Sequence, residues 1–234
     1  MRVLVVGFPA AAFATNCYII APGPGSECLV VDPGVDVTDP LEEVLQRHHL
    51  QPAAVLLTHG HIDHTFSVTP VCGAKGIPAY IHGDDADLLA DPMKGLSQQT
   101  KDFFGGRLNW TEPDDVRSLN DAATISLAGV ELLVDHAPGH TPGSVMFHVD
   151  NDGEPTLLSG DVLFAGSIGR TDLPGGSPEA MMRSLADKCL PLPDDTVVLP
   201  GHGPTTTIGA ERAANPFLAE AARGTTPAPP ARGL

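Results

Sequence analysis

Short apolar segments recur along the whole chain, and they constrain its fold more than any other feature. Each is rich in Val, Ile and Leu and is bounded by Gly, Pro or Asp, which is the pattern of β-strands between tight turns. Ten segments show it: 3–8, 16–20, 28–32, 54–58, 79–82, 124–127, 130–135, 144–150, 156–161 and 196–202. The sequence therefore predicts a protein built around β-sheets.

Helical patterns separate some of these strands. Two of them begin at Thr38 and Ser177, each with a proline in its first turn, and a third begins at Ile208 and is interrupted at Pro216. We expect Thr38 and Ser177 to be N-caps, since their hydroxyls accept hydrogen bonds from the first turn. Runs of strands that then alternate with helices, twice over, favour a layered α/β sandwich over a doubly wound sheet.

The 234 residues show no internal boundary, so we expect one domain over residues 1–222. Residues 223–234 lack hydrophobic periodicity and are expected to be disordered. The first 16 residues contain one Arg and an apolar run, as a short signal peptide does. Because Gly7 and Pro9 interrupt that run, we expect a strand there rather than a cleaved leader.

The net charge argues against two classes of partner, and the cysteine content indicates the cellular compartment. Acidic residues outnumber basic residues 29 to 13, giving a formal net charge of −16. Nucleic acids and anionic membrane surfaces both require a dense Lys/Arg face, so neither is an expected partner. Four scattered cysteines without C-x-x-C spacing indicate reduced thiols and a cytoplasmic protein. The sequence carries no signal of oligomeric state.

Three histidines and an aspartate follow one predicted strand within six residues. The segment THGHIDH (58–64) contains His59, His61, Asp63 and His64. Imidazole nitrogen and carboxylate oxygen suit zinc, iron and manganese. A single His-x-His pair is common on protein surfaces, whereas four candidate ligands directly after an apolar strand predict a metal site.

Three further candidates each end an apolar segment beside a glycine. They are His140, Asp161 and His202, next to Gly139, Gly160 and Gly201. Strands that share one edge of a sheet deliver their last residues to a common rim, so we expect these side chains to meet the first cluster. The glycines would allow the backbone to approach a crowded centre closely.

The whole series, His-x-His-x-Asp-His followed by His140, Asp161 and His202, resembles the metallo-β-lactamase superfamily over residues 1–222. Residues 161–176 (DVLFAGSIGRTDLPGG) and 199–212 (LPGHGPTTTIGAER) are most similar to the glyoxalase II (hydroxyacylglutathione hydrolase) group, in a compact bacterial form. This resemblance implies an αββα four-layer sandwich with two divalent metal ions at the sheet edge.

The resemblance also implies a role for each candidate. One metal would be held by His59, His61 and His140, the other by Asp63, His64 and His202, with Asp161 bridging the two. Zinc is the first expectation, with iron and manganese as alternatives, because these ligands suit all three. The nucleophile would be a hydroxide between the metals, since a bound metal lowers the pKa of water to about 7. Asp63 and Asp161 would be the catalytic carboxylates.

Residues outside the ligand set have two interpretations each. Arg170 lies where glyoxalase II enzymes have a basic residue that meets the thiol carrier, or it forms a surface pair with Asp172. Asp32 either supports the metal ligands through a hydrogen bond or belongs to an Asp-Pro-Gly turn. The remaining histidines are expected to be structural: His48, His49, His82, His136 and His148.

The resemblance to the glyoxalase II group implies a binuclear hydrolase of small-molecule thioesters such as S-lactoylglutathione. Glyoxalase II enzymes grip glutathione with a C-terminal helical domain, whereas 32 residues follow His202 here, so we expect other thiol carriers to be accepted too. Three alternatives stay open: a mononuclear iron persulfide dioxygenase, a non-catalytic binding member of the fold, and a lactamase or lactonase. The PGHG motif around His202 favours the hydrolase over the dioxygenase.

Overall fold

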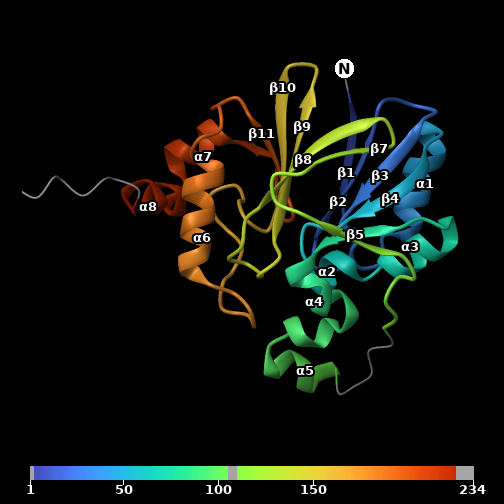
Figure 1. Ribbon diagram of the computed structural model, residues 1–234, viewed down its shortest axis with the longest axis horizontal. Helices are drawn as coiled ribbons and strands as arrows, with labels where there is room; N and C mark the ends of the chain where they lie inside the picture. The colour runs from blue at the N-terminus through green and yellow to red at the C-terminus, as the bar shows by residue number, and fades with distance from the viewer. Residues whose placement is uncertain (1–2, 105–109, 225–234) are drawn as a thin grey trace, which may run out of the picture.

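Two β-sheets lie face to face, with helices on both outer sides (Figure 1). The computed structural model describes residues 3–104 and 110–224, and within them each sheet has six strands. Helices α1 (Thr38–His48) and α3 (Val68–Lys75) cover one sheet, and helices α6 (Pro178–Ser184), α7 (Ile208–Ala214) and α8 (Pro216–Gly224) cover the other. The predicted αββα four-layer sandwich is confirmed.

The first sheet carries the N-terminal half of the chain. Its spatial order is β1 (Leu4–Pro9), β2 (Asn16–Ala21), β3 (Glu27–Val31), β4 (Gln51–Leu56), β5 (Ala79–His82) and β6 (Val116–Leu119). The strands β3 to β6 pair in parallel, so their C-terminal ends share one edge. THGHIDH follows β4 directly and therefore begins at that edge.

The second sheet delivers the other candidates in the same way. Its order is β12 (Thr206–Thr207), β11 (Val197–Pro200), β10 (Glu154–Gly160), β9 (Val145–Asn151), β8 (Val130–His136) and β7 (Thr124–Leu127). Strands β10 and β11 are parallel, and β8 and β10 are both antiparallel to β9. The chain therefore leaves β8, β10 and β11 at a single edge, just before His140, Asp161 and His202.

Short helices surround this edge in the first half of the chain (Figure 1). They are α2 (Ile62–Thr65), α4 (Ala86–Ala90) and α5 (Gln98–Phe104), with 3-10 turns η1 (Gly83–Asp85) and η2 (Pro92–Gly95) between them. A π-helical turn, η3 (Leu185–Cys189), continues α6.

The predicted caps have different outcomes. Ser177 caps α6, because its Oγ accepts a hydrogen bond from the backbone N–H of Ala180 at 3.2 Å. The prediction for Thr38 is wrong, since α1 begins at Thr38 and the N-cap residue is Val37, which makes no side-chain cap bond. Val37 is fully buried and its carbonyl accepts the first helical hydrogen bond from Leu41 N at 2.8 Å, so packing starts the helix one residue early.

Three apolar layers fill the sandwich: one between the sheets and one under each helical layer. All four cysteines are buried and free. Among the residues that the structure describes, no helix is long and apolar enough to cross a membrane. Helix α8 runs to Gly224, two residues past the expected domain boundary, and the rest of the predicted tail lies outside the described residues.

Candidate metal centre

All seven predicted ligands meet at the shared edge of the two sheets. Their ligand atoms form three groups in which every atom lies within 4.8 Å of the others. The groups are His59, His61 and His140; His59, His64 and Asp161; and Asp63, His64 and His202. The first sheet supplies four of these residues and the second sheet three, so the cluster exists only where the sheets pack together.

The distances place Asp161 in the middle of the cluster. Its Oδ1 lies 3.3 Å from His64 Nε2. Its Oδ2 lies 3.5 Å from His140 Nε2 and 3.6 Å from His202 Nε2. On one side His61 Nδ1 is 2.8 Å from His140 Nε2. Asp161 therefore faces both predicted groups of ligands at once.

Hydrogen bonds outside the cluster orient the imidazole rings. Asp32 Oδ2 lies 2.9 Å from His64 Nδ1, and the carbonyl of Arg170 lies 2.7 Å from His140 Nδ1. His59 Nδ1 lies 3.1 Å from Thr58 Oγ1. Because a carbonyl or carboxylate keeps the proton on Nδ1, the Nε2 lone pair of His64 and of His140 points into the cluster.

Asp32 belongs to this supporting network. It is buried, and it also accepts hydrogen bonds from Thr58 N at 2.8 Å and Thr58 Oγ1 at 2.6 Å. Its φ of 51° lies in the left-handed region, which aspartate tolerates better than most residues. The structure favours the first of its two interpretations, because Asp32 supports His64 of the cluster through a hydrogen bond. Its bonds to Thr58 also link the end of β3 to the end of β4.

The cluster fits divalent metal ions. Buried His59 Nε2 and Asp161 Oδ1 have no hydrogen-bond partner, and an orphaned buried polar atom is costly unless something else binds it. Burial, reinforced by neighbouring histidines, lowers the pKa of His61 to about 3 and that of His59 well below its usual value. Both rings are therefore neutral at neutral pH, as metal ligands must be.

The carboxylates make the centre strongly negative. Burial raises the pKa of Asp63, but His64 and His202 outweigh it and hold that pKa well below the usual range. Burial lowers the pKa of His64, yet Asp161, Asp63 and Asp32 outweigh it and raise the value. The surrounding carboxylates thus favour the protonated form of His64. A cation bound beside His64 would offset the same negative charge.

Glycines let the backbone approach this centre. A Cβ on Gly201 would lie 2.2 Å from Asp161 Oδ1 and 2.7 Å from His64 Cε1. Gly160 has a φ of 48°, and a Cβ there would lie 2.6 Å from Thr58 Oγ1. Larger residues at either position would displace a ligand or its support.

A cavity of about 540 Å³ opens over the cluster. His61, Asp63, His140, Asp161 and His202 line it, and most of its remaining lining is apolar. Its size suits a small-molecule substrate whose reacting atoms would sit against the cluster.

Comparison with known proteins agrees with this arrangement. The profile of the metallo-beta-lactamase superfamily matches residues 10–202. The chain belongs to this superfamily. It therefore has the fold and the His/Asp cluster of a metal-dependent hydrolase.

Relatives in this superfamily span nearly the whole chain. An uncharacterized protein of Mycobacterium tuberculosis is 48% identical over 219 residues, covering 92% of this chain and 97% of the relative. The hydroxyacylglutathione hydrolase GloC of Haemophilus influenzae is 34% identical over 211 residues, covering 90% and 95%.

Two solved structures are similarly close. The BLEG-1 B3 metallo-beta-lactamase has a TM-score of 0.81 at 38% identity and covers 92% of this chain and 99% of its own. TTHA1623, solved in a di-iron-bound form, has a TM-score of 0.75 at 37% identity and covers 91% and 100%.

Arg170 forms the predicted surface pair with Asp172 and also lines the cavity, while its contact with a thiol carrier stays a prediction. It lies on the rim of the cavity, while its exposed guanidinium forms a two-pronged pair with Asp172, Nε–Oδ1 at 2.7 Å and Nη2–Oδ2 at 2.8 Å. The Arg170 carbonyl also holds His140. The backbone carbonyl of Arg170 thus orients a clustered histidine, while its side chain is paired with Asp172.

Sequence reasoning missed Asp85. This fully buried carboxylate accepts hydrogen bonds from Gly60 N at 2.8 Å, Thr141 Oγ1 at 2.7 Å and Gly143 N at 2.7 Å. It therefore joins the loop of His59 and His61 to the loop of His140. Nothing in the sequence HGDD distinguishes it from its exposed neighbour Asp84, because its partners come from distant segments.

The other histidines lie outside the cluster. His82 and His136 stack with ring centroids 4.0 Å apart, and with Asp84 they form another group of candidate ligands. Because the two rings are nearly parallel, their nitrogen lone pairs do not converge on one position, so this group suits a metal less well. His48 and His49 end helix α1.

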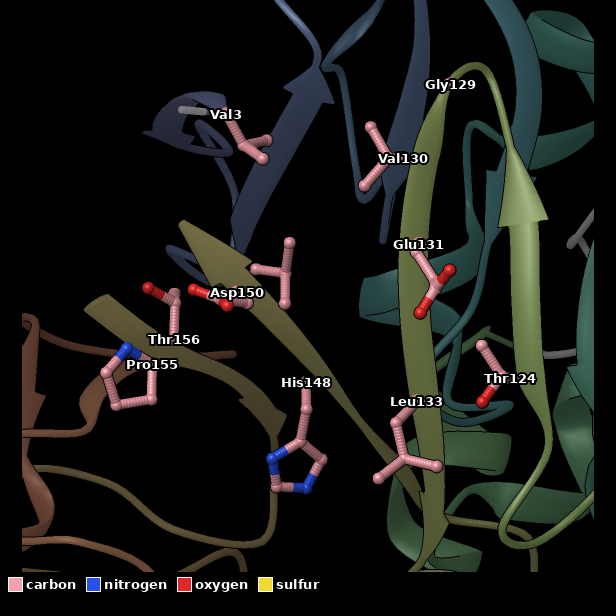
Figure 2. Close-up of a pocket in the computed structure, with 11 residues that line it drawn as sticks. Val3, Thr124, Gly129, Val130, Glu131, Leu133, His148, Asp150, Pro155 and Thr156 are labelled. Carbon is pink, nitrogen blue, oxygen red and sulfur yellow. The ribbon is translucent and has the colours of Figure 1, made fainter. Parts of the chain in front are cut away.

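A separate hollow is lined by residues of strands β7 to β10 of the second sheet and by Val3 (Figure 2). Leu133, His148, Asp150 and Pro155 are among the residues that line it, and none of the seven clustered residues does. His148 Nε2 is paired with Asp135 at 2.8 Å, as expected of a structural histidine.

Proposed function

We propose that the protein is a binuclear metal-dependent hydrolase of small-molecule thioesters, of the glyoxalase II type. The observation that carries this proposal is the position of Asp161 between two sets of ligands on the floor of a cavity. The 34% identity to a hydroxyacylglutathione hydrolase supports the choice of thioesters. The 37% identity to a protein solved with two irons supports a binuclear centre.

Each metal has a defined ligand set in this proposal. His59, His61 and His140 would hold one cation, and Asp63, His64 and His202 would hold the other, with Asp161 available to both. Divalent cations bound by these residues would supply an acidified water as nucleophile and a Lewis acid for the thioester carbonyl. Zinc is our first candidate, and the di-iron relative makes iron the main alternative.

The protein's own groups orient the attacking water and the clustered histidines. Water adds to the carbonyl carbon, the carbon–sulfur bond breaks, and the products are a carboxylic acid and a thiol. Asp63 lines the cavity and is ionised, so it can accept a hydrogen bond from the attacking water and orient it. Asp32 and the Arg170 carbonyl keep His64 and His140 turned toward the centre.

A second candidate activity is β-lactam hydrolysis. The 38% identity and TM-score of 0.81 to a B3 metallo-beta-lactamase favour it, and the same centre can attack an amide carbonyl. We rank it second because the GRTDLPGG segment (169–176) resembles that of enzymes acting on thiol-derived substrates.

The activities separate in one experiment. Protein purified without chelators is assayed with S-lactoylglutathione, with the chromogenic lactam nitrocefin, and with glutathione persulfide in an oxygen electrode. We expect thiol release from the thioester, lost after dialysis against a chelator and restored by zinc. Turnover of nitrocefin alone, or oxygen uptake alone, would contradict the thioesterase assignment.

A further inference from the structure

Exposed large hydrophobic side chains concentrate at the mouth of the cavity. Among the residues that the structure describes, three stand out: Phe13 is 65% exposed, Leu133 is 39% exposed and Phe66 is 37% exposed. Phe13 and Phe66 both line the cavity over the metal centre. Aromatic rings held in water beside a cavity mark a binding surface for an apolar group.

The loop that carries Phe13 is strained and anchored. Phe13 has a φ of 64° and Ala14 a φ of 54°, and a bulky residue in this left-handed region is a genuine outlier. The loop is closed by a 2.7 Å hydrogen bond from Ala10 N to the Thr15 carbonyl. Buried Thr15 donates its hydroxyl to Asp63 at 3.2 Å. Backbone strain held this close to a ligand is characteristic of functional sites.

Other segments extend the apolar wall inward. Phe164, Leu96 and Leu173 line the same cavity and are half-buried. The Phe164 ring lies edge-on to His202, with ring centroids 5.9 Å apart. The wall therefore runs from the mouth to a proposed metal ligand.

Charged groups that could hold an anionic substrate are scarce. Of the described residues that line the cavity, Arg170 alone carries a permanent positive charge, and Asp172 already neutralises it. The chain as a whole carries a formal charge of −16. Away from the proposed metal centre, a tripeptide carrier with two carboxylates and an ammonium group would lose hydration against this wall and find few charged partners there.

We propose that this cavity selects thioesters of uncharged, apolar thiol carriers over thioesters of glutathione, with Phe13 and Phe66 as the specificity-determining residues. This inference rests on the proposed thioesterase function and names the class of its substrate. An apolar carrier buried against the two rings supplies the binding energy that positions the reacting carbonyl.

Two substrates with the same acyl group test the selection. They are S-lactoylglutathione and the lactoyl thioester of benzyl mercaptan, assayed by thiol release on the metal-loaded protein. Burial of one phenyl ring predicts a kcat/KM about tenfold higher for the benzyl substrate.

The variant Phe13→Asn removes the ring without straining the loop, since asparagine adopts the left-handed region more readily. We expect it to raise KM for the benzyl thioester about tenfold at nearly unchanged kcat, because the contact is made in the ground state and transition state alike. S-lactoylglutathione kinetics should change less than about twofold. Leu133→Asn is the control, because it removes an exposed large hydrophobic side chain, 39% exposed, from the hollow of Figure 2 and not from the cavity. It should leave the kinetics of both substrates unchanged.

A binding measurement separates this inference from the thioesterase assignment. The Kd of a non-hydrolysable benzyl thioether analogue is measured by calorimetry on the wild-type protein and on Phe13→Asn. Weaker binding to the variant supports the inference even if neither thioester is hydrolysed, a result that would overturn only the proposed function. Preference for S-lactoylglutathione, or analogue binding that is absent or unaffected by Phe13→Asn, would overturn the inference.

Discussion

At the scale of single residues, the proposed centre depends on a few carboxylates in a crowd of histidines. Asp161 and Asp63 are kept ionised by His64 and by the other histidines around them. Asp161 lies near members of both proposed ligand sets, whereas the ion-pair distances of the Asp63 carboxylate to clustered histidines involve His202 and His64 of one set. Their substitutions should therefore differ in effect.

Asp161→Ala is expected to abolish metal binding and hydrolysis together. The two cations would lose their shared anionic ligand, and their mutual repulsion would be offset less. Elemental analysis and thioester kinetics on the variant check this expectation. Full metal content with full turnover would show that the ligand assignment is wrong.

Asp63→Asn is expected to keep much of the first metal and to lose most activity. The amide is neutral and a poorer ligand for the second cation, while His59, His61 and His140 are unchanged. Metal content and kcat are measured on the same preparation. Unchanged turnover would mean that the second cation is dispensable.

At the scale of elements, turn η1 holds the ligand loops together through Asp85. Its carboxylate accepts two backbone N–H groups and one hydroxyl from loops of different sheets. Burial raises the pKa of Asp85, and the hydrogen bonds from Thr141, Gly60 and Gly143 oppose that rise. The same bonds hold the carboxylate in position. Asp85 is a positioning residue, since it touches none of the seven clustered side chains by a hydrogen bond.

Asp85→Ala is expected to weaken metal binding about tenfold to a hundredfold, the usual effect of removing support from behind metal ligands. Asp85→Asn should be intermediate, because an amide keeps one acceptor oxygen and replaces the other with a donor. Competition with a coloured zinc chelator measures the affinity. Exposed Asp84 gives the control variant Asp84→Ala, which should bind metal as the wild type does; equal affinity in all four proteins would refute the role of Asp85.

Most strands were predictable because their cause is local, whereas the short strands β6 and β12 were not predicted and β4 begins and ends before the expected residues. Apolar runs bounded by Gly and Asp produced the sheets, and the polar residues at the ends of β4, β8, β10 and β11 became the cluster. Helix α3 was not predicted, because Pro70 and Gly73 obscure its short pattern. The roles of Asp85 and Phe13 also could not be predicted, since they depend on contacts and on a loop conformation that only the folded chain creates.

At the scale of the whole molecule, each sheet contributes one part of the centre. The first sheet brings His59, His61, Asp63 and His64, and the second brings His140, Asp161 and His202. We therefore expect metal binding to stabilise the packed sandwich, because the unfolded chain cannot assemble this site. The apolar cavity lies over the same junction, so the proposed metal centre and the proposed substrate-binding surface share one edge of the sandwich.

The number of metal ions per chain tests this account most directly. Protein purified without chelators is analysed for metals, and its oxygen consumption with glutathione persulfide is recorded in parallel. We predict two divalent metal ions per chain and no oxygen uptake. One iron per chain, an unoccupied second site and oxygen uptake would contradict the account and identify a dioxygenase instead.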